Sequence, residues 1–360
     1  LVGIAAAHGL MSSGQPQSGR QLATSGLFDD VVAGDVIGVA AARATVLSEK
    51  GAPYPRARDG ELDAAEVQST VAAQRAKLTA RQKLQPAYGA LLDALAASTL
   101  PFDAGLQKER ELFLALVPTT AAQALRYQFK VEREATKLPP AFQAPAREVR
   151  SIAVIGAGTM GSGIAISALD AGLAVLLLEQ DGAALERGRQ RIADHYRERV
   201  AAGKLSTDAA SSNEARLQTS LEWERLQQAD LVIEAVFEDM AVKQEVFRKI
   251  DAHARSGAVL ATNTSYLDID TIAAVTSCPQ DVLGLHFFSP ANVMKLLEVV
   301  RGAKTAPDVL ATGMARGATL KKMAVLTGNA FGFIGNRIYN GYRRQSEFML
   351  QDGAWPEDVD

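Results

Sequence analysis

A histidine and a glutamate in the last third of the chain have the types and surroundings of a proton-transfer pair. His286 ends an apolar run, and Glu298 lies twelve residues further on within another. Oxidation of an alcohol by hydride transfer needs a base for the hydroxyl proton, and histidine suits this task because it titrates near neutral pH. A buried carboxylate on the second imidazole nitrogen fixes the tautomer and stabilises the protonated ring. A single histidine is more often a satisfied core residue, so the residue types alone leave both interpretations open.

A glycine-rich segment upstream has the spacing of a dinucleotide-binding loop. Gly156-Ala157-Gly158-Thr159-Met160-Gly161 follows an apolar run and opens an apolar helical stretch. The first glycine allows a tight turn, the second lets the backbone approach a pyrophosphate, and the third lets helix and strand pack closely. Glu179 ends the next apolar run, 179 − 161 = 18 residues after the last glycine, near the ~20 expected for the acid that binds the ribose hydroxyls. A carboxylate there repels a 2′-phosphate, which favours NAD over NADP; the alternative is a solvated strand-end glutamate.

These candidates need a sheet whose strands end at a common edge. Strands that alternate with helices, beginning with a helix over 160–171, predict a mostly parallel, doubly wound α/β sheet covered on both faces. In such sheets ligands lie beyond the carboxyl ends of the strands, where several later strands place polar residues. The strands are expected at 151–155, 174–178, 231–235, 259–261, 282–286 and 295–300.

The preceding residues have a helical pattern. Residues 1–50 combine short helical runs with turn clusters, and the Gly- and Pro-rich residues 51–56 are expected to be a linker. From 63 to about 137, apolar residues recur at three- and four-residue spacing, and three prolines divide the stretch into separate helices.

Composition and charge narrow the class of protein. The 360 residues are enough for two or three domains, and 48% hydrophobic with 22% charged residues is an ordinary globular balance. A net charge of −3 gives no basic footprint for nucleic acid. With one cysteine, Cys278, and no close pairing of histidines, neither a disulfide nor a metal site is expected. The apolar run 160–178 is interrupted by Asp170 and several glycines, so no transmembrane segment is expected.

Five blocks in this order resemble the 3-hydroxyacyl-CoA dehydrogenase family: Val154–Ala165, Glu234–Glu238 with Lys243, Asn263-Thr264-Ser265, His286–Val299 and Gly332–Arg337. The resemblance implies a Rossmann-type domain that oxidises an L-3-hydroxyacyl thioester of coenzyme A to the 3-ketoacyl-CoA with NAD. It also implies the following catalytic groups: His286 as general base, Glu298 as its partner, and Ser265 and Asn336 as groups that hold the reacting oxygen and thioester. The residues expected at the NAD site are Gly156, Gly158, Thr159, Met160, Gly161, Glu179, Val236, Phe237, Glu238, Lys243, Ser265 and Ser289.

Two positions differ from the pattern of single-function members of this family. Glu179 stands where aspartate is usual, which is expected to keep NAD selectivity and shift the ribose slightly. Ser289 stands where asparagine is usual. The segment from His286 to Pro290 is more similar to the multifunctional branch, whose members act in fatty-acid β-oxidation.

The rest of the chain is also similar to that branch. Residues 1–50 resemble the C-terminal remnant of an enoyl-CoA hydratase (crotonase) domain, and 51–148 resemble the helical linker region. The NAD-binding domain is expected at 149–328, and 329–360 are expected to be the truncated start of a C-terminal all-α domain. Both ends are thus expected to be cuts in a longer protein. That protein would also hydrate 2-enoyl-CoA, with catalytic glutamates upstream of this chain.

Two other functions stay open at this point. One is a β-hydroxyacid dehydrogenase that acts on a free acid, although such enzymes use a lysine rather than a His–Glu pair. The other is a non-catalytic NAD-binding protein of the same fold. The expected partner is an acyl-CoA substrate, and the sequence gives no indication of oligomeric state. The alanine-rich composition fits a bacterial cytoplasmic protein, and the peroxisome is the alternative compartment.

Overall fold

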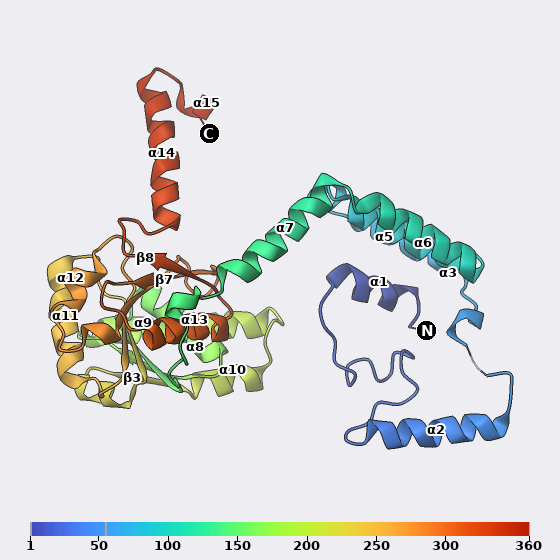
Figure 1. Cartoon of the computed structure of the whole chain (residues 1–360), viewed down its shortest axis with the longest axis horizontal. Coiled ribbons are helices and arrows are strands. Elements are labelled where there is room, and N and C mark those ends of the chain that lie inside the picture. Colours follow the sequence, from blue (N-terminus) through green and yellow to red (C-terminus); the bar gives the residue numbers. More distant parts are fainter. Residues whose placement is uncertain (1, 55, 360) are drawn as a thin grey trace. The chain divides into compact units, whose positions relative to one another are not determined.

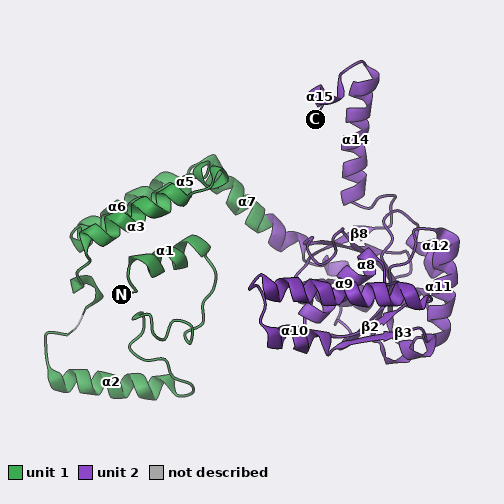
Figure 2. Cartoon of the chain, turned by 180° about the vertical axis from the view of Figure 1, so that it is seen from behind, with its two compact units in different colours: residues 1–130 green, residues 131–360 purple. Residues whose placement is uncertain are grey.

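The computed structural model describes residues 2–54 and 56–359, which belong to two compact units. The first unit is Leu1–Lys130 and the second is Val131–Asp360. The boundary falls inside helix α7 (Thr120–Ala135), as the two colours of Figure 2 show.

An eight-stranded sheet forms the centre of the second unit (Figure 1). Its strand order is β3-β2-β1-β4-β5-β6-β7-β8. Strands β1 to β6 are parallel, β7 is antiparallel to β6, and β8 is parallel to β7. The chain fills one side of β1 first and then crosses to β4 on the other side, so the predicted doubly wound sheet is confirmed. The strands are β1 (Ser151–Ile155), β2 (Ala174–Leu178), β3 (Leu217–Ser220), β4 (Leu231–Glu234), β5 (Val259–Thr262), β6 (Val282–Phe287), β7 (Leu296–Arg301) and β8 (Met323–Gly328).

Helices cover both faces of this sheet, because side chains alternate between the faces along each strand. In β1, Ile152 and Val154 pack into one buried cluster, whereas Ala153 and Ile155 pack into the other. The first cluster includes residues of α8, α9 and α13, and the second includes residues of α11 and α12. The helices of this unit are α8 (Thr159–Asp170), α9 (Gly182–Ala201), α10 (Thr207–Glu214), α11 (Met240–His253), α12 (Ile269–Ala273), α13 (Pro307–Thr319), α14 (Gly335–Gln351) and α15 (Pro356–Val359).

The six strands expected from the sequence are present, each within one residue of its predicted ends. The sequence does not predict β3 and β8. Strand β3 has the sequence Leu-Gln-Thr-Ser at one edge of the sheet, and only its last residue is buried. Strand β8 forms the other edge and is mostly half-buried. Edge strands carry a weak apolar pattern because part of their surface stays in solvent.

The first unit is helical, as predicted. It has a small core in which Ile4 of α1 packs with Val67 and Val71 of α3 and with Leu92 and Leu95 of α5. Proline is the first residue of α5, where its missing N–H leaves no hydrogen bond unmade. None of the described helices is long and apolar enough to cross a membrane. The α-helices are α1 (Ile4–Ser13), α2 (Val36–Lys50), α3 (Ala64–Lys77), α4 (Ala80–Lys83), α5 (Pro86–Ala96), α6 (Phe102–Leu116) and the first part of α7.

Candidate active site

The glycine loop joins β1 to α8 at the point where the strand order reverses. Gly156 has φ +102°, a conformation that side-chain-bearing residues rarely adopt, and a Cβ there would lie 2.7 Å from the Ala235 carbonyl oxygen. A Cβ on Gly161 would lie 1.8 Å from the Gly156 carbonyl oxygen. The first and third glycines are therefore required by the protein's own packing.

Gly158 differs from these two glycines. Its φ of −69° is open to any residue, and a Cβ there would meet no protein atom within 4 Å. Gly158 and Thr159 are exposed at the N-terminus of α8, and Met160 is half-buried beside them. A helix N-terminus attracts anions through its free amides and its dipole. Open space over an unshielded backbone is what a bound pyrophosphate needs, so the loop fits NAD.

Exchanging each of these glycines for alanine should separate ligand contact from folding. We expect Gly158→Ala to keep the urea stability of the wild type, since its Cβ meets open space, but to weaken NADH binding by about tenfold because overpacking costs ~1–3 kcal/mol. Gly161→Ala should instead lower the free energy of unfolding, because its Cβ overlaps backbone. Fluorescence titration with NADH and urea denaturation measure the two effects. If Gly158→Ala bound NADH as tightly as the wild type, the loop around Gly158 would not contact the cofactor.

Glu179 lies at the end of β2 beside the glycine loop. Its Oε2 accepts a hydrogen bond from the Ala157 amide at 2.9 Å, and its Oε1 accepts one from the Gln180 amide at 2.7 Å. The carboxylate is thus held against the loop, at the position from which an acid reaches the ribose of a bound dinucleotide.

The loop after β4 contributes the next group of predicted residues. The Phe237 ring is 83% exposed, and Val236 is half-buried. Glu238 Oε1 accepts hydrogen bonds from the Thr264 hydroxyl at 2.6 Å and from the amides of Ser265 and Tyr266. This contact joins the β4 loop to the loop after β5.

Lys243, on α11, is placed differently from the other predicted cofactor residues. Its side chain is fully buried, and its Nζ lies 2.6 Å from Glu234 Oε1 and 3.4 Å from Glu238 Oε2. The structure therefore brings Lys243 to the loops of the cofactor site but gives it no surface there.

His286 and Glu298 are directly opposite each other in the sheet. The antiparallel register of β6 and β7 pairs them, and His286 Nδ1 lies 2.6 Å from Glu298 Oε2. Both side chains are almost completely buried. The second oxygen of Glu298 accepts hydrogen bonds from the amides of Ile334, at 3.0 Å, and Gly335, at 2.7 Å.

The surroundings of Glu298 keep it ionised. Burial disfavours the carboxylate, but the hydrogen bond with His286 and those from the two amides outweigh burial, so the pKa of Glu298 lies below its ordinary value. An ionised partner on Nδ1 keeps a proton there and leaves Nε2 as the acceptor, which is the tautomer that a general base requires.

Aromatic rings hold the imidazole in place. The Phe288 ring centroid is 4.4 Å from that of His286, and the buried Phe333 ring is 5.6 Å away. A Cβ on Gly335 would lie 2.7 Å from the Phe288 ring, so a side chain there would have to displace the ring that packs against His286. In the sequence these residues stand out only as parts of the matching blocks. Their packing role depends on contacts between distant segments, which no local pattern encodes.

The remaining predicted residues lie around the same edge. Ser265 is half-buried in the loop after β5, and the Asn263 side chain ties that loop to β6 by accepting from the Phe287 amide at 2.8 Å. Asn336 is half-buried in the first turn of α14, immediately after the amide that binds Glu298. Ser289 is exposed just beyond β6 and precedes a cis peptide bond to Pro290.

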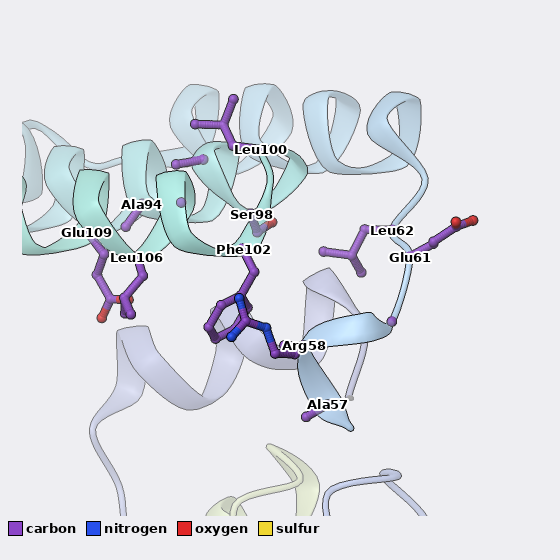
Figure 3. A pocket seen from close by; sticks show the side chains of 13 residues that line it. Ala57, Arg58, Glu61, Leu62, Ala94, Ser98, Leu100, Phe102, Leu106 and Glu109 are labelled. Atoms are coloured by element: carbon purple, nitrogen blue, oxygen red, sulfur yellow. The ribbon is translucent and has the colours of Figure 1, made fainter. Parts of the chain in front are cut away.

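The first unit has a hollow of its own, which Figure 3 shows from close by. It measures about 300 Å³ and lies among the α5–α6 region and residues 57–62. Arg58 stacks over the Phe102 ring at 4.7 Å and forms an ion pair with Asp103 at 2.8 Å. Its charge is therefore already matched, and none of the predicted catalytic or cofactor residues lines this hollow. Among residues 2–54 and 56–359, no cluster of histidine, cysteine and acidic side chains is arranged to hold a metal ion.

A doubly wound sheet, a glycine loop at its switch point and a buried His–Glu pair at the same edge define an NAD-dependent dehydrogenase. Residues 151–330 match the family model described as the NAD binding domain of 3-hydroxyacyl-CoA dehydrogenase. The chain belongs to this family.

Known proteins agree with this assignment. The chain is 38% identical over 379 residues to a peroxisomal bifunctional enzyme of Danio rerio, with 100% of this chain and 50% of the relative covered. It is 42% identical over 270 residues to the Homo sapiens protein of the same name, covering 74% of this chain and 37% of the relative. The chain thus spans about half or less of these curated relatives.

Solved structures show the same fold. The crystal structure of (S)-3-hydroxybutyryl-CoA dehydrogenase from Ralstonia eutropha superposes with a TM-score of 0.58 at 33% identity, covering 59% of this chain and 76% of that one. The fold, the cofactor and the membership in the multifunctional branch predicted from the sequence are confirmed.

Proposed function

We propose that this chain oxidises the 3-hydroxyl group of an L-3-hydroxyacyl-CoA, with His286 as general base and Glu298 as its partner. The observation that carries the proposal is the 2.6 Å contact between two buried side chains at the cofactor edge of the sheet. Oxidation of an alcohol transfers the hydroxyl proton and the carbon-bound hydride to two different acceptors. The His–Glu pair provides the acceptor for the proton.

Each residue has a separate task in this reaction. His286 Nε2 takes the proton of the 3-hydroxyl, and Glu298 stabilises the resulting imidazolium through Nδ1. Ser265 and Asn336 are proposed to hold the reacting oxygen and the thioester. NAD, when bound, supplies the acceptor for the C3 hydride. Gly158 and the N-terminus of α8 bind its pyrophosphate, and Met160, Val236 and Phe237 line its path.

Reduction of acetoacetyl-CoA by NADH, with acetoacetate as the free-acid control, tests the proposal in the full 360-residue chain. Consumption of NADH with the thioester alone is the expected result. Preference for the free acid would favour a hydroxyacid dehydrogenase. A chain that binds NADH and reduces neither compound would be a binding protein, and the proposal would fall.

Glu179 should set the choice between NAD and NADP. Glu179→Gln keeps an oxygen that can accept from the Ala157 amide but removes the charge that faces a 2′-phosphate. We expect the affinity for NADPH relative to NADH to rise by about tenfold or more, as expected when ~1.4 kcal/mol of like-charge repulsion is removed. Competitive titrations with both cofactors measure the ratio, and an unchanged ratio would assign selectivity to another residue.

The remaining assignments extend to the longer protein. We infer that residues 1–50 belong to a hydratase domain, 51–148 to the linker, 149–328 to the NAD-binding domain and 329–360 to a helical domain. A longer protein of this kind would act in fatty-acid β-oxidation. Relatives named peroxisomal support the peroxisome rather than the cytoplasm as its compartment. Localisation of the tagged full-length protein in its own cells distinguishes the two.

A further inference from the structure

One buried phenylalanine beside the His–Glu pair has a backbone conformation that its side chain disfavours. Phe333 has φ +46°, in the left-handed region, directly after Gly332 with φ +72°. A bulky residue in this region is an outlier, which persists only where the surrounding contacts hold it. We propose that Phe333 is a positioning residue, whose left-handed backbone turns the start of α14 onto Glu298 while its ring packs against His286. The inference rests on the proposed function, because it concerns the residues proposed as the base and its partner.

The backbone of this turn brings two donors to one carboxylate oxygen. The Phe333 amide donates to the Ala330 carbonyl at 2.8 Å, which closes the turn. The next two amides, those of Ile334 and Gly335, donate to Glu298 Oε1 at 3.0 and 2.7 Å. They lie at the N-terminus of the 17-residue helix α14, so the carboxylate also meets the positive end of the helix dipole. Because φ of residue 333 sets the direction of the chain that follows it, a right-handed φ there would turn both amides away.

The side chain of Phe333 supplies the contacts that hold this backbone. It is 3% exposed and belongs to the buried cluster that includes Ile269 of α12 and Val300 of β7. Its ring centroid lies 5.6 Å from that of His286, with an angle of 57° between the ring planes. Glycine would adopt the left-handed conformation without steric cost, so conformation alone does not explain a phenylalanine here. What glycine lacks is the ring, which holds the turn in the core and contacts the imidazole.

The segment before Phe333 is also anchored. Asn329 Oδ1 accepts from the Ile269 amide at 3.2 Å, and Asn329 Nδ2 donates to Asp270 Oδ2 at 2.9 Å. Phe333 therefore lies in a short connection between two fixed points, α12 at one end and Glu298 at the other. A change in the packing of its ring is passed on to the amides that bind Glu298, because the connection has little length in which to absorb it.

The first test is a double-mutant cycle between Phe333→Leu and Glu298→Gln in the 360-residue chain. Leucine keeps an apolar side chain but loses the ring, so the left-handed turn is held less firmly. We expect kcat for acetoacetyl-CoA reduction to fall by about tenfold to a hundredfold, as for a misplaced catalytic group, with the Kd for NADH within about twofold of the wild type. In Glu298→Gln the same change should lower kcat by a much smaller factor, because the carboxylate is already absent. Equal factors in the two backgrounds would overturn the proposal.

Phe247→Leu is the matched control for this cycle. Phe247 is also fully buried and belongs to the same cluster, but it lies on α11. The aromatic rings that contact His286 in the described part of the chain are those of Phe288 and Phe333. We expect Phe247→Leu to lower the urea midpoint about as much as Phe333→Leu and to keep kcat within about twofold of the wild type. The same fall in kcat in both leucine variants would assign the effect of Phe333 to lost packing.

Stability against acid gives a readout that needs no substrate. Burial opposes ionisation of Glu298, but its hydrogen bonds with His286 and with the two amides hold its pKa below the ordinary value of 4.5. A lowered native pKa adds stability above the unfolded value, and this stability disappears as the pH falls through the native value. Phe333→Leu withdraws the amides, so its loss of stability relative to the wild type should be largest near pH 7 and should shrink below about pH 5.

The control for the acid measurement is again Phe247→Leu, whose loss of stability should not change with pH. Among the described residues, the titratable group that faces Glu298 is His286 on β6, and it is present in all these variants. A loss of stability in Phe333→Leu that is constant from about pH 7 to about pH 4 would contradict the proposal.

A milder variant keeps the test available if Phe333→Leu does not fold. Phe333→Met carries an unbranched side chain that adapts to irregular space, and Phe247→Met is its control. The expected changes have the same direction and are smaller. A wild-type chain that reduces no acetoacetyl-CoA would contradict the proposed function, whereas the comparison of acid stability would still decide whether Phe333 acts through Glu298.

Discussion

Replacing His286 by glutamine is expected to lower kcat for acetoacetyl-CoA reduction by about two to four orders of magnitude. The glutamine side chain has a similar length, and its NH2 group can donate a hydrogen bond to Glu298, so the buried carboxylate keeps a partner. It cannot exchange a proton near neutral pH. The chemical step then loses its base, while the glycine loop and the β4 loop are unchanged.

The control for this variant is its binding of NADH. Because His286 lies in β6 and does not form the glycine loop, the Kd for NADH should stay within about twofold of the wild type, the range of small changes at a distance. Loss of activity together with loss of NADH binding would indicate a misfolded edge rather than a missing base. If both proteins turned over acetoacetyl-CoA equally fast, the proposed reaction would still hold, but His286 would not be its general base.

The glycine loop could be predicted from sequence because its requirements are local. Gly156 and Gly161 are demanded by backbone atoms a few residues away or just beyond the end of the neighbouring strand, whereas a Cβ on Gly158 would meet no protein atom within 4 Å. Strand, loop and helix follow one another without interruption, so the order of residues carries most of the information.

The His–Glu pair could be predicted only in part. The residue types and their positions in two apolar runs indicate a possible pair. Their contact, however, depends on an antiparallel register that places His286 opposite Glu298. A shift by one residue would turn one of them to the other face of the sheet. The amides of Ile334 and Gly335 come from a segment more than thirty residues away, and no periodicity predicts that approach.

The burial of Lys243 left a signal in the sequence. Lys243, Val246, Phe247 and Ile250 follow the i, i+3, i+4, i+7 spacing of the inward face of a helix, and all four are buried. A lysine within such a stripe must have an anionic partner, and Lys243 has two, Glu234 at the end of β4 and Glu238 in the loop that follows. The helical pattern thus predicts burial, whereas the family block alone predicts a cofactor contact.

Replacing Glu298 by glutamine should lower activity by about two to four orders of magnitude, although His286 itself stays in place. Glu298 uses one oxygen for His286 and the other for the amides of Ile334 and Gly335. Glutamine has only one oxygen. If that oxygen faces the two amides, its NH2 group faces Nδ1 and forces the proton to Nε2, the wrong tautomer for a base. If the oxygen faces His286, two amide donors meet the NH2 group and lose their acceptor.

The same change should alter the response of stability to acid. In the wild type the pKa of Glu298 is lowered, so its contribution to folding is complete above its ordinary value of 4.5 and disappears as the pH falls through the native value. Glu298→Gln removes that titration, and its unfolding free energy should fall less steeply below about pH 5 than that of the wild type. Urea denaturation across this range measures the slope. If the two proteins had parallel slopes, the partners of Glu298 would not lower its pKa. The low activity of the variant would then reflect lost packing instead of a wrong tautomer.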